Sequence, residues 1–154
     1  MKLNFLCDHH RASLRNERSA AATASTRAYV CALEILRQEQ YVPVIHHAGS
    51  AVEAAEILLL GLEKPTARGI NRYSEAAALP VHLLLGLGEK IAARTAIACA
   101  DGTLQRLVAR GLDRPTVLAG CERLMRLEDQ ARSSSTLRAW TGDLRMRMPC
   151  SQQH

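Results

Sequence analysis

One six-residue stretch is written twice in this 154-residue chain, first as Gly61-Leu62-Glu63-Lys64-Pro65-Thr66 and fifty residues later as Gly111-Leu112-Asp113-Arg114-Pro115-Thr116. Glycine is favoured just past the end of a helix, and proline is favoured in the first turn of the next one. Each copy therefore predicts one helix that ends and another that begins. This punctuation suggests a chain of helices joined by short turns.

The composition favours the same fold class. Apolar residues make up 47% of the chain and aromatic residues only 3%, and the apolar residues are mostly alanine and leucine. These residues are strong helix formers, whereas strands prefer β-branched and aromatic side chains. No alternating strand pattern occurs, so we predict an all-α protein.

The first half of the chain predicts two amphipathic helices. One is expected to start at Thr26 as its cap and to end near Tyr41, because Pro43 disfavours helical geometry just before it. A short turn follows up to Gly49, which fits a left-handed helix end. Ser50 and Glu53 have the spacing of a capping box, and this places the start of the second helix at Ala51.

The second half predicts several more helices. Pro65 is expected in the first turn of a helix that runs to Gly86, with Pro80 kinking or splitting it. A further helix should reach Ala100, and Asp101 should cap a short one after it. After Asp113 as a cap and Pro115 in the first turn, a clear apolar stripe predicts a helix with Val117, Leu118, Cys121, Leu124 and Met125 on one face.

Seven or eight short helices with short connections are expected to pair as antiparallel hairpins. By region, we expect a poorly patterned lead-in or frayed helix over 1–25 and a helical-hairpin domain over 26–132. A short basic helix over 133–148 and a disordered tail over 149–154 would complete the chain. The predicted fold is a stack of hairpins, and the alternative is a compact helix bundle.

Two stretches, 48–54 and 69–76, resemble the turn and the second-helix opening of tetratricopeptide repeats. The resemblance covers roughly residues 26–110, lacks the family's Trp-x-x-Leu-Gly opening, and places Pro80 where the family prefers a large apolar residue. The region 71–111 is also similar to small bacterial chaperones of type III secretion needle subunits. The resemblance implies a right-handed superhelix with a concave protein-binding surface and no catalysis.

We therefore expect a non-catalytic adaptor or chaperone-like module that binds a protein partner or a peptide helix in a helical groove. The residues expected to line this groove are Tyr29, Leu33, Ile45 and Tyr73, with Arg72 at its rim. The leucine-rich run at 79–87 would suit a homodimer as readily as a core.

The alternative function is a DNA-binding regulator. Both copies of the repeated stretch resemble the elbow of a helix-turn-helix, and the formal net charge of +5 is compatible with a phosphate partner. The residues that would face the groove of DNA are Lys64, Thr66, Arg68, Arg114 and Thr116. Against this alternative, Ile57 and Leu107 lie where the elbow normally needs a small residue.

No motif for a catalytic centre or a cofactor occurs, and we expect neither. The pairs His9/His10 and His46/His47 are the only clusters with the chemistry of metal ligands, and a site would require the N-terminus to fold onto residues 46–47. Cys7 beside the first pair is a candidate reactive thiol without an evident orienting acid.

The remaining expectations concern one histidine, the cysteines and membrane spans. His82 is expected to be a satisfied core histidine. Five scattered cysteines suit a reducing cytoplasm, and no apolar stretch is long enough for a membrane span.

Overall fold

In the computed structural model, which describes residues 4–110 and 114–133, the chain forms six α-helices and no strand within those ranges. The all-α class predicted from the composition is therefore confirmed. The helices are α1 (Asp8–Asn16), α2 (Arg18–Arg37), α3 (Tyr41–Gly61), α4 (Ala67–Gly86), α5 (Lys90–Ala109) and α6 (Arg114–Ser133).

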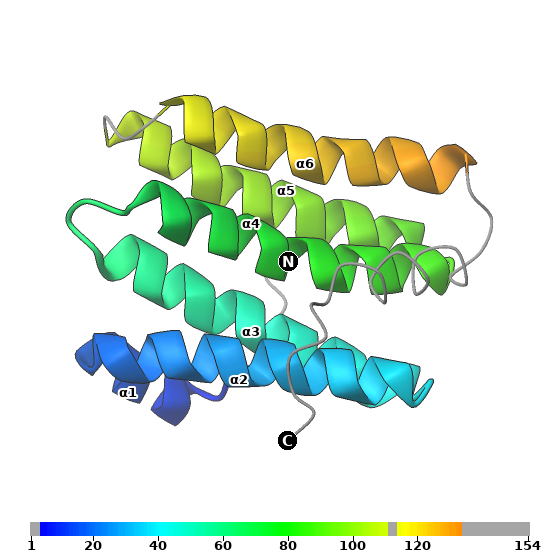
Figure 1. Ribbon diagram of the computed structural model, residues 1–154, viewed down its shortest axis with the longest axis horizontal. Helices are drawn as coiled ribbons and strands as arrows, with labels where there is room; N and C mark the ends of the chain where they lie inside the picture. The colour runs from blue at the N-terminus through cyan, green and yellow to red at the C-terminus, as the bar shows by residue number, and fades with distance from the viewer. Residues whose placement is uncertain (1–3, 111–113, 134–154) are drawn as a thin grey trace, which may run out of the picture.

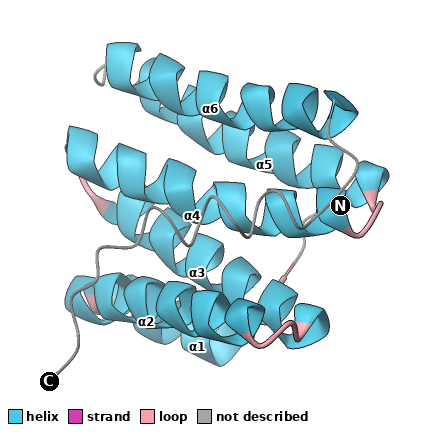
Figure 2. Ribbon diagram, turned by 45° about the vertical axis from the view of Figure 1, so that its right-hand side comes forward, coloured by secondary structure: helices cyan, strands magenta, loops and turns pink. Residues whose placement is uncertain are grey.

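The five long helices lie side by side, and each runs antiparallel to the one before it (Figure 1). Helix α2 packs along α3, while α4 occupies the middle and contacts α3, α5 and α6. The short α1 lies against α2 and α3 at the outer edge, on the side away from α6 (Figure 2). Short turns impose this arrangement, because a helix that follows a tight turn must fold back on its predecessor.

The larger core cluster joins α3, α4, α5 and α6. On α4 its residues recur at three- and four-residue steps and so form one face of the helix. The members with less than 1% exposure are Ile70, Val81, Leu104, Leu107 and Leu124. Because α4 contributes to this cluster along most of its length, it is the central helix of the core.

A smaller cluster joins α2 to α3 and to the second half of α4. It consists of Ala32, Leu36, Val44, Ala48, Leu79 and Leu83. Leu79, Leu83 and Leu84 are thus buried inside the chain, so most of the leucine-rich run at 79–87 serves the core, and Leu87 remains exposed.

The break expected between Tyr41 and Ala51 does not exist, because α3 is a single helix. Pro43 lies in its first turn, where backbone N–H groups have no partner within the helix and proline is tolerated. Gly49 lies inside the helix and not at a left-handed end, and Glu53 caps no helix start. The helix that was expected to start at Thr26 is α2, which begins earlier, at Arg18. Thr26 lies inside this helix and does not cap its start, and its hydroxyl donates to the carbonyl of Ala22.

Helix α4 likewise continues through Pro80. A proline inside a helix costs about 3 kcal/mol, but full burial of a large apolar side chain returns roughly 1.5–3 kcal/mol, and both neighbours, Leu79 and Val81, are buried. Helix α5 runs through Asp101, whose carboxylate bonds to Gln105 one turn later and caps no helix.

The structure shows that the two prolines of the repeated stretch occupy different positions relative to the helix that follows each. Pro65 precedes the helix, and Thr66 is the N-cap of α4, where its hydroxyl accepts from the N–H of Gly69 at 3.1 Å. Pro115 lies in the first turn of α6, as predicted. Gly88, with φ +80°, makes the left-handed turn between α4 and α5. The cap expected at Asp113, the basic helix expected over 133–148 and the tail over 149–154 lie outside the described residues.

Candidate functional site

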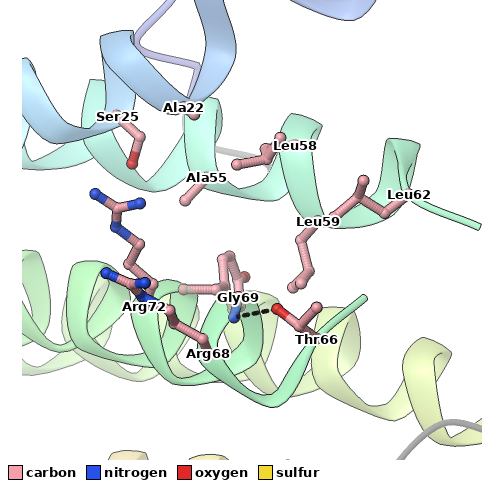
Figure 3. Close-up of a pocket in the computed structure, with 11 residues that line it drawn as sticks. Ala22, Ser25, Ala55, Leu58, Leu59, Leu62, Thr66, Arg68, Gly69 and Arg72 are labelled. Atoms are coloured by element: carbon pink, nitrogen blue, oxygen red, sulfur yellow. Dashed lines mark hydrogen bonds between the residues drawn. The ribbon is translucent and has the colours of Figure 1, made fainter. Parts of the chain in front are cut away.

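A groove of about 320 Å³ opens between α2, α3 and α4. Its volume lies at the lower end of the roughly 300–1,000 Å³ that is usual for ligand pockets. The residues that line it are Ala22 and Ser25 from α2, Ala55, Leu58 and Leu59 from α3, Leu62 and Thr66 from the turn, and Arg68, Gly69, Arg72 and Tyr73 from α4. Figure 3 shows these side chains in the space between the three helices.

The floor of the groove is apolar. Leu58 and Leu59 from the last turns of α3 and Leu62 from the turn that follows supply most of it. Tyr73 closes the bottom and is only 2% exposed. Such a surface favours an apolar ligand segment over a charged one.

The rim is basic. Arg68 and Arg72 are four residues apart on α4, so both reach the same side of the helix (Figure 3). Arg72 donates to the Thr26 hydroxyl at 2.7 Å and so connects α4 to α2. Within the described part of the chain, Arg68 has no hydrogen bond or ion pair, and its guanidinium is exposed. The groove therefore combines an apolar floor with a positive edge.

A buried polar network supports the groove from below. Burial raises the pKa of the Tyr73 phenol, which lies close to Thr103 on α5. The Thr103 hydroxyl donates to Glu56 at 3.0 Å, and Arg106 donates to the same carboxylate at 3.0 Å. These bonds join α3 and α5 beside Tyr73.

One arginine also holds the end of α3. Arg110 donates to the carbonyls of Leu60 at 3.3 Å, Leu62 at 2.8 Å and Glu63 at 3.3 Å. The last carbonyls of a helix lack partners within the helix, and cations stabilise that end. The groove wall at Leu62 is therefore fixed from α5.

The structure brings two of the five expected binding residues, Arg72 and Tyr73, into the groove. Tyr29, Leu33 and Ile45 pack instead against the smaller core cluster. Tyr29 is half-buried, and burial, followed by the nearby charge of Glu75, raises the pKa of its phenol. These three residues are parts of the packing between helices and not of the groove.

Sequence reasoning missed most of the groove. Apolar residues at helical spacing, as at the end of α3, are usually covered, so the pattern does not mark an open groove. One signal was present in the sequence: Ala22, Ser25 and Ala55 are small, and small residues on facing helices leave space. Their facing positions only became apparent in the structure.

The first turns of α4 and α6, which contain or directly follow the five residues of the DNA-binding alternative, lie at the same end of the molecule (Figure 1). Lys64, Thr66, Arg68 and Arg114 are exposed, while Thr116 is half-buried. The helices before and after Gly61 run side by side and antiparallel, whereas the helices of a helix-turn-helix cross at about 90–120°.

The N-terminus does fold onto residues 46–47, but it brings Phe5, and not the pair His9/His10, against His46. Within residues 4–110 and 114–133, no three His, Cys, Asp or Glu side chains gather as they would around a metal ion. The Cys7 thiol lies 3.1 Å from Nδ1 of His10 on the exposed side of α1. His82 is half-buried and has at least one polar or ring contact.

No protein-family model, curated protein or solved structure shows significant similarity to this chain. Among the helices that the structure describes, none has both the length and the apolar character needed to cross a membrane.

Proposed function

We propose that this protein is a non-catalytic interaction module, adaptor or chaperone-like, which binds a segment of a partner protein in the groove between α2, α3 and α4. The observation that carries the proposal is the apolar floor of Leu58, Leu59 and Leu62 beneath the rim arginines Arg68 and Arg72. The free cysteines Cys7, Cys31, Cys99 and Cys121 support a cytoplasmic location, where thiols stay reduced.

The chemistry of the groove selects the kind of segment. Apolar side chains spaced along one face of a helix would cover the leucines, and acidic side chains beside them would meet the two guanidinium groups. The N-terminus of α4 adds partial positive charge at the same edge. The proposed ligand is therefore an amphipathic helix whose apolar face is flanked by Asp or Glu.

The arrangement of helices supports a hairpin stack like that of tetratricopeptide repeats. Helix α4 contacts its hairpin partner α5 and also α6, the first helix after that hairpin. A small residue allows the second contact: a Cβ on Gly120 would lie 2.5 Å from the Ser74 hydroxyl. In a stack each hairpin buries the face that its neighbour exposes, and α2 with α3 would form the preceding hairpin.

The test uses a labelled helical peptide with leucines at i, i+3, i+4 and i+7 and glutamates beside them. Fluorescence anisotropy should show saturable binding to the full chain. Arg68→Glu should weaken that binding about fivefold or more, the equivalent of roughly 1 kcal/mol for one exposed charge pair. A peptide with lysine in place of each glutamate should bind more weakly than the acidic one.

Two controls make the result specific to the groove. Arg15→Glu changes the charge by the same amount on α1, outside the groove, and should leave binding unchanged. Ala22→Leu fills the groove from α2 and should block binding without adding charge. Equal binding of the acidic and basic peptides, or full binding by Ala22→Leu, would contradict the proposal.

DNA binding remains the second candidate, favoured by the exposure of Lys64, Arg68 and Arg114 at one end of the molecule. It predicts binding to duplex DNA that weakens steeply with salt, because bound cations are released from the phosphates. Replacing Lys64 and Arg114 by alanine should then reduce both affinity and salt dependence. Absence of binding at about 50 mM salt would leave the protein partner as the only candidate.

A further inference from the structure

A buried carboxylate on α3 binds the backbone of the N-terminal segment. Glu53 is only 6% exposed. Its two oxygens accept from consecutive backbone amides, that of Phe5 at 2.8 Å and that of Leu6 at 2.9 Å. Arg11 on α1 forms an ion pair with the same carboxylate at 3.3 Å. A buried carboxylate is costly unless it is paired and hydrogen-bonded, so these contacts account for its charge.

The ring of Phe5 occupies a position made for it by a glycine. It lies directly over Gly49, where any Cβ would overlap the ring. It also meets the imidazole of His46 edge-on, with ring centroids 5.9 Å apart. Glycine inside a helix costs roughly 0.5–1 kcal/mol relative to alanine. At position 49 the absence of a Cβ leaves room for the Phe5 ring, which lies against the helix backbone there.

The N-terminal segment contributes little to the apolar core. Helix α1, which follows it, has no buried residue, and Phe5 belongs to neither core cluster. Regions with few buried apolar contacts open at low free energy while the rest of a protein stays folded. Residues 4–7 can therefore leave α3 without unfolding the helices that carry the site.

The site is separate from the groove. His46, Gly49 and Glu53 follow one another at three- and four-residue steps and so share a face of α3. Glu53 and Ala55 are two residues apart, which places the groove face about 200° around the helix. The two sites consequently lie on opposite sides of α3.

We propose that His46, Gly49 and Glu53 form a recognition site for an extended peptide in which an aromatic residue is followed by a residue with a free backbone N–H. In the isolated chain, residues 4–7 occupy this site. A partner segment of the same chemistry displaces them. The carboxylate recognises the two amides and is indifferent to the second side chain, while the space over Gly49 selects the aromatic ring.

The test uses an acetylated peptide of residues 4–10 and full-length protein carrying Phe5→Ala, which vacates the aromatic position. NMR titration should show saturable shifts of the Gly49 amide signal. Wild-type protein should need at least about tenfold more peptide, because a short tether gives its own segment an effective concentration on the order of millimolar. A peptide with alanine in place of Phe5 should bind at least tenfold more weakly.

Two receiver variants assign the contacts. Glu53→Gln should weaken peptide binding about tenfold, because one of its two acceptors becomes a donor facing an amide N–H. Arg68→Glu alters the groove on the opposite side and should leave binding unchanged, so failure here is distinguishable from failure of the groove proposal. If the Gly49 signal does not move at several millimolar peptide, or if the phenylalanine and alanine peptides bind equally, the proposed site is wrong.

Discussion

Helices α6 and α2 flank α4 on opposite sides and meet it differently. On the side of α6, Gly120 lies so close to Ser74 that a Cβ would come within 2.5 Å of its hydroxyl. On the side of α2, the two helices leave the groove open, and Arg72 reaches across it to Thr26 at 2.7 Å. Helix α4 thus has a closely packed interface with α6 and an open groove on the side of α2.

The difference shows that small residues do not by themselves bring helices together. Gly120 allows close approach because leucines around it, such as Leu104 and Leu124, fill the surrounding space. Ala22 and Ser25 are also small, but the larger residues near them, Leu58 and Leu59, belong to the floor of the groove. The side of α4 that faces α6 is closely packed, whereas the side that faces α2 leaves a groove.

The largest contrast is expected in thiol chemistry. Cys121 on α6 follows Gly120 and lies beside Asp101 on α5, and burial, followed by a hydrogen bond to Asp101 and its charge, raises the pKa of the thiol to about 12. Cys31 on α2 is exposed. Because the thiolate is the reactive form, single-cysteine variants at pH 8 should show Cys121 reacting at least about tenfold more slowly with a thiol reagent. Equal rates in the folded protein would contradict the shielding of Cys121 beside α5, and denaturant should equalise the two rates.

The same raised pKa predicts a pH effect on stability. The unfolded thiol ionises near pH 8.5, whereas the folded thiol keeps its proton until much higher pH. Folding is therefore favoured by Cys121 below about pH 8.5, and this advantage declines as pH rises toward 12. Cys121→Ala should show a shallower loss of stability between pH 8 and 10 in urea titrations.

A leucine inserted on the closed side should destabilise the fold strongly. Gly120→Leu forces a large side chain against Ser74 and Leu104, and overpacking of this kind costs about 1–3 kcal/mol or more. Urea denaturation measures the change. Gly102→Ala is the matched control, because a Cβ at Gly102 would meet nothing within 4 Å, and it should stabilise α5 by roughly 0.5–1 kcal/mol.

Removal of one member of the buried network should have an intermediate effect. Thr103→Val keeps the shape of the side chain but removes the hydroxyl that donates to Glu56. Loss of a buried hydrogen-bond partner costs about 1–3 kcal/mol. A cost near zero in urea denaturation would mean that the network does not stabilise the packing of α3 against α5.

The smallest effect is expected on the open side. Ala22→Leu adds the same kind of side chain as Gly120→Leu, but it points into the groove, so the free energy of unfolding should change by no more than about 0.5 kcal/mol. A loss similar to that of Gly120→Leu would remove the contrast between the two sides of α4.

Much of the fold could be predicted from the sequence, because class follows from composition and periodicity. The boundaries were less accurate, since proline and glycine have different meanings at different positions. Pro43 was interpreted as a stop but lies in a first turn, and Gly49 was interpreted as a helix end but accommodates Phe5. A proline or glycine pattern does not reveal what lies beside it in space.

The candidate site was predicted only in part. Two of the residues expected to line a groove, Arg72 and Tyr73, line the observed one. Tyr29 packs against the smaller core cluster, because its environment depends on how α2 meets α4. The distance between two helices far apart in sequence depends on the whole set of side chains between them and is not written in any local pattern.

The hydrogen bonds from Arg110 to the end of α3 determine how short a fragment of this protein can be and still keep the groove intact. All eleven residues that line the groove lie at or before Tyr73, so a fragment ending after α4 would contain every one of them. It would lack the arginine that holds the carbonyls of Leu60, Leu62 and Glu63. The smallest fragment that keeps the groove and this arginine therefore extends to Arg110, directly after α5, even though α5 contributes no side chain to the groove.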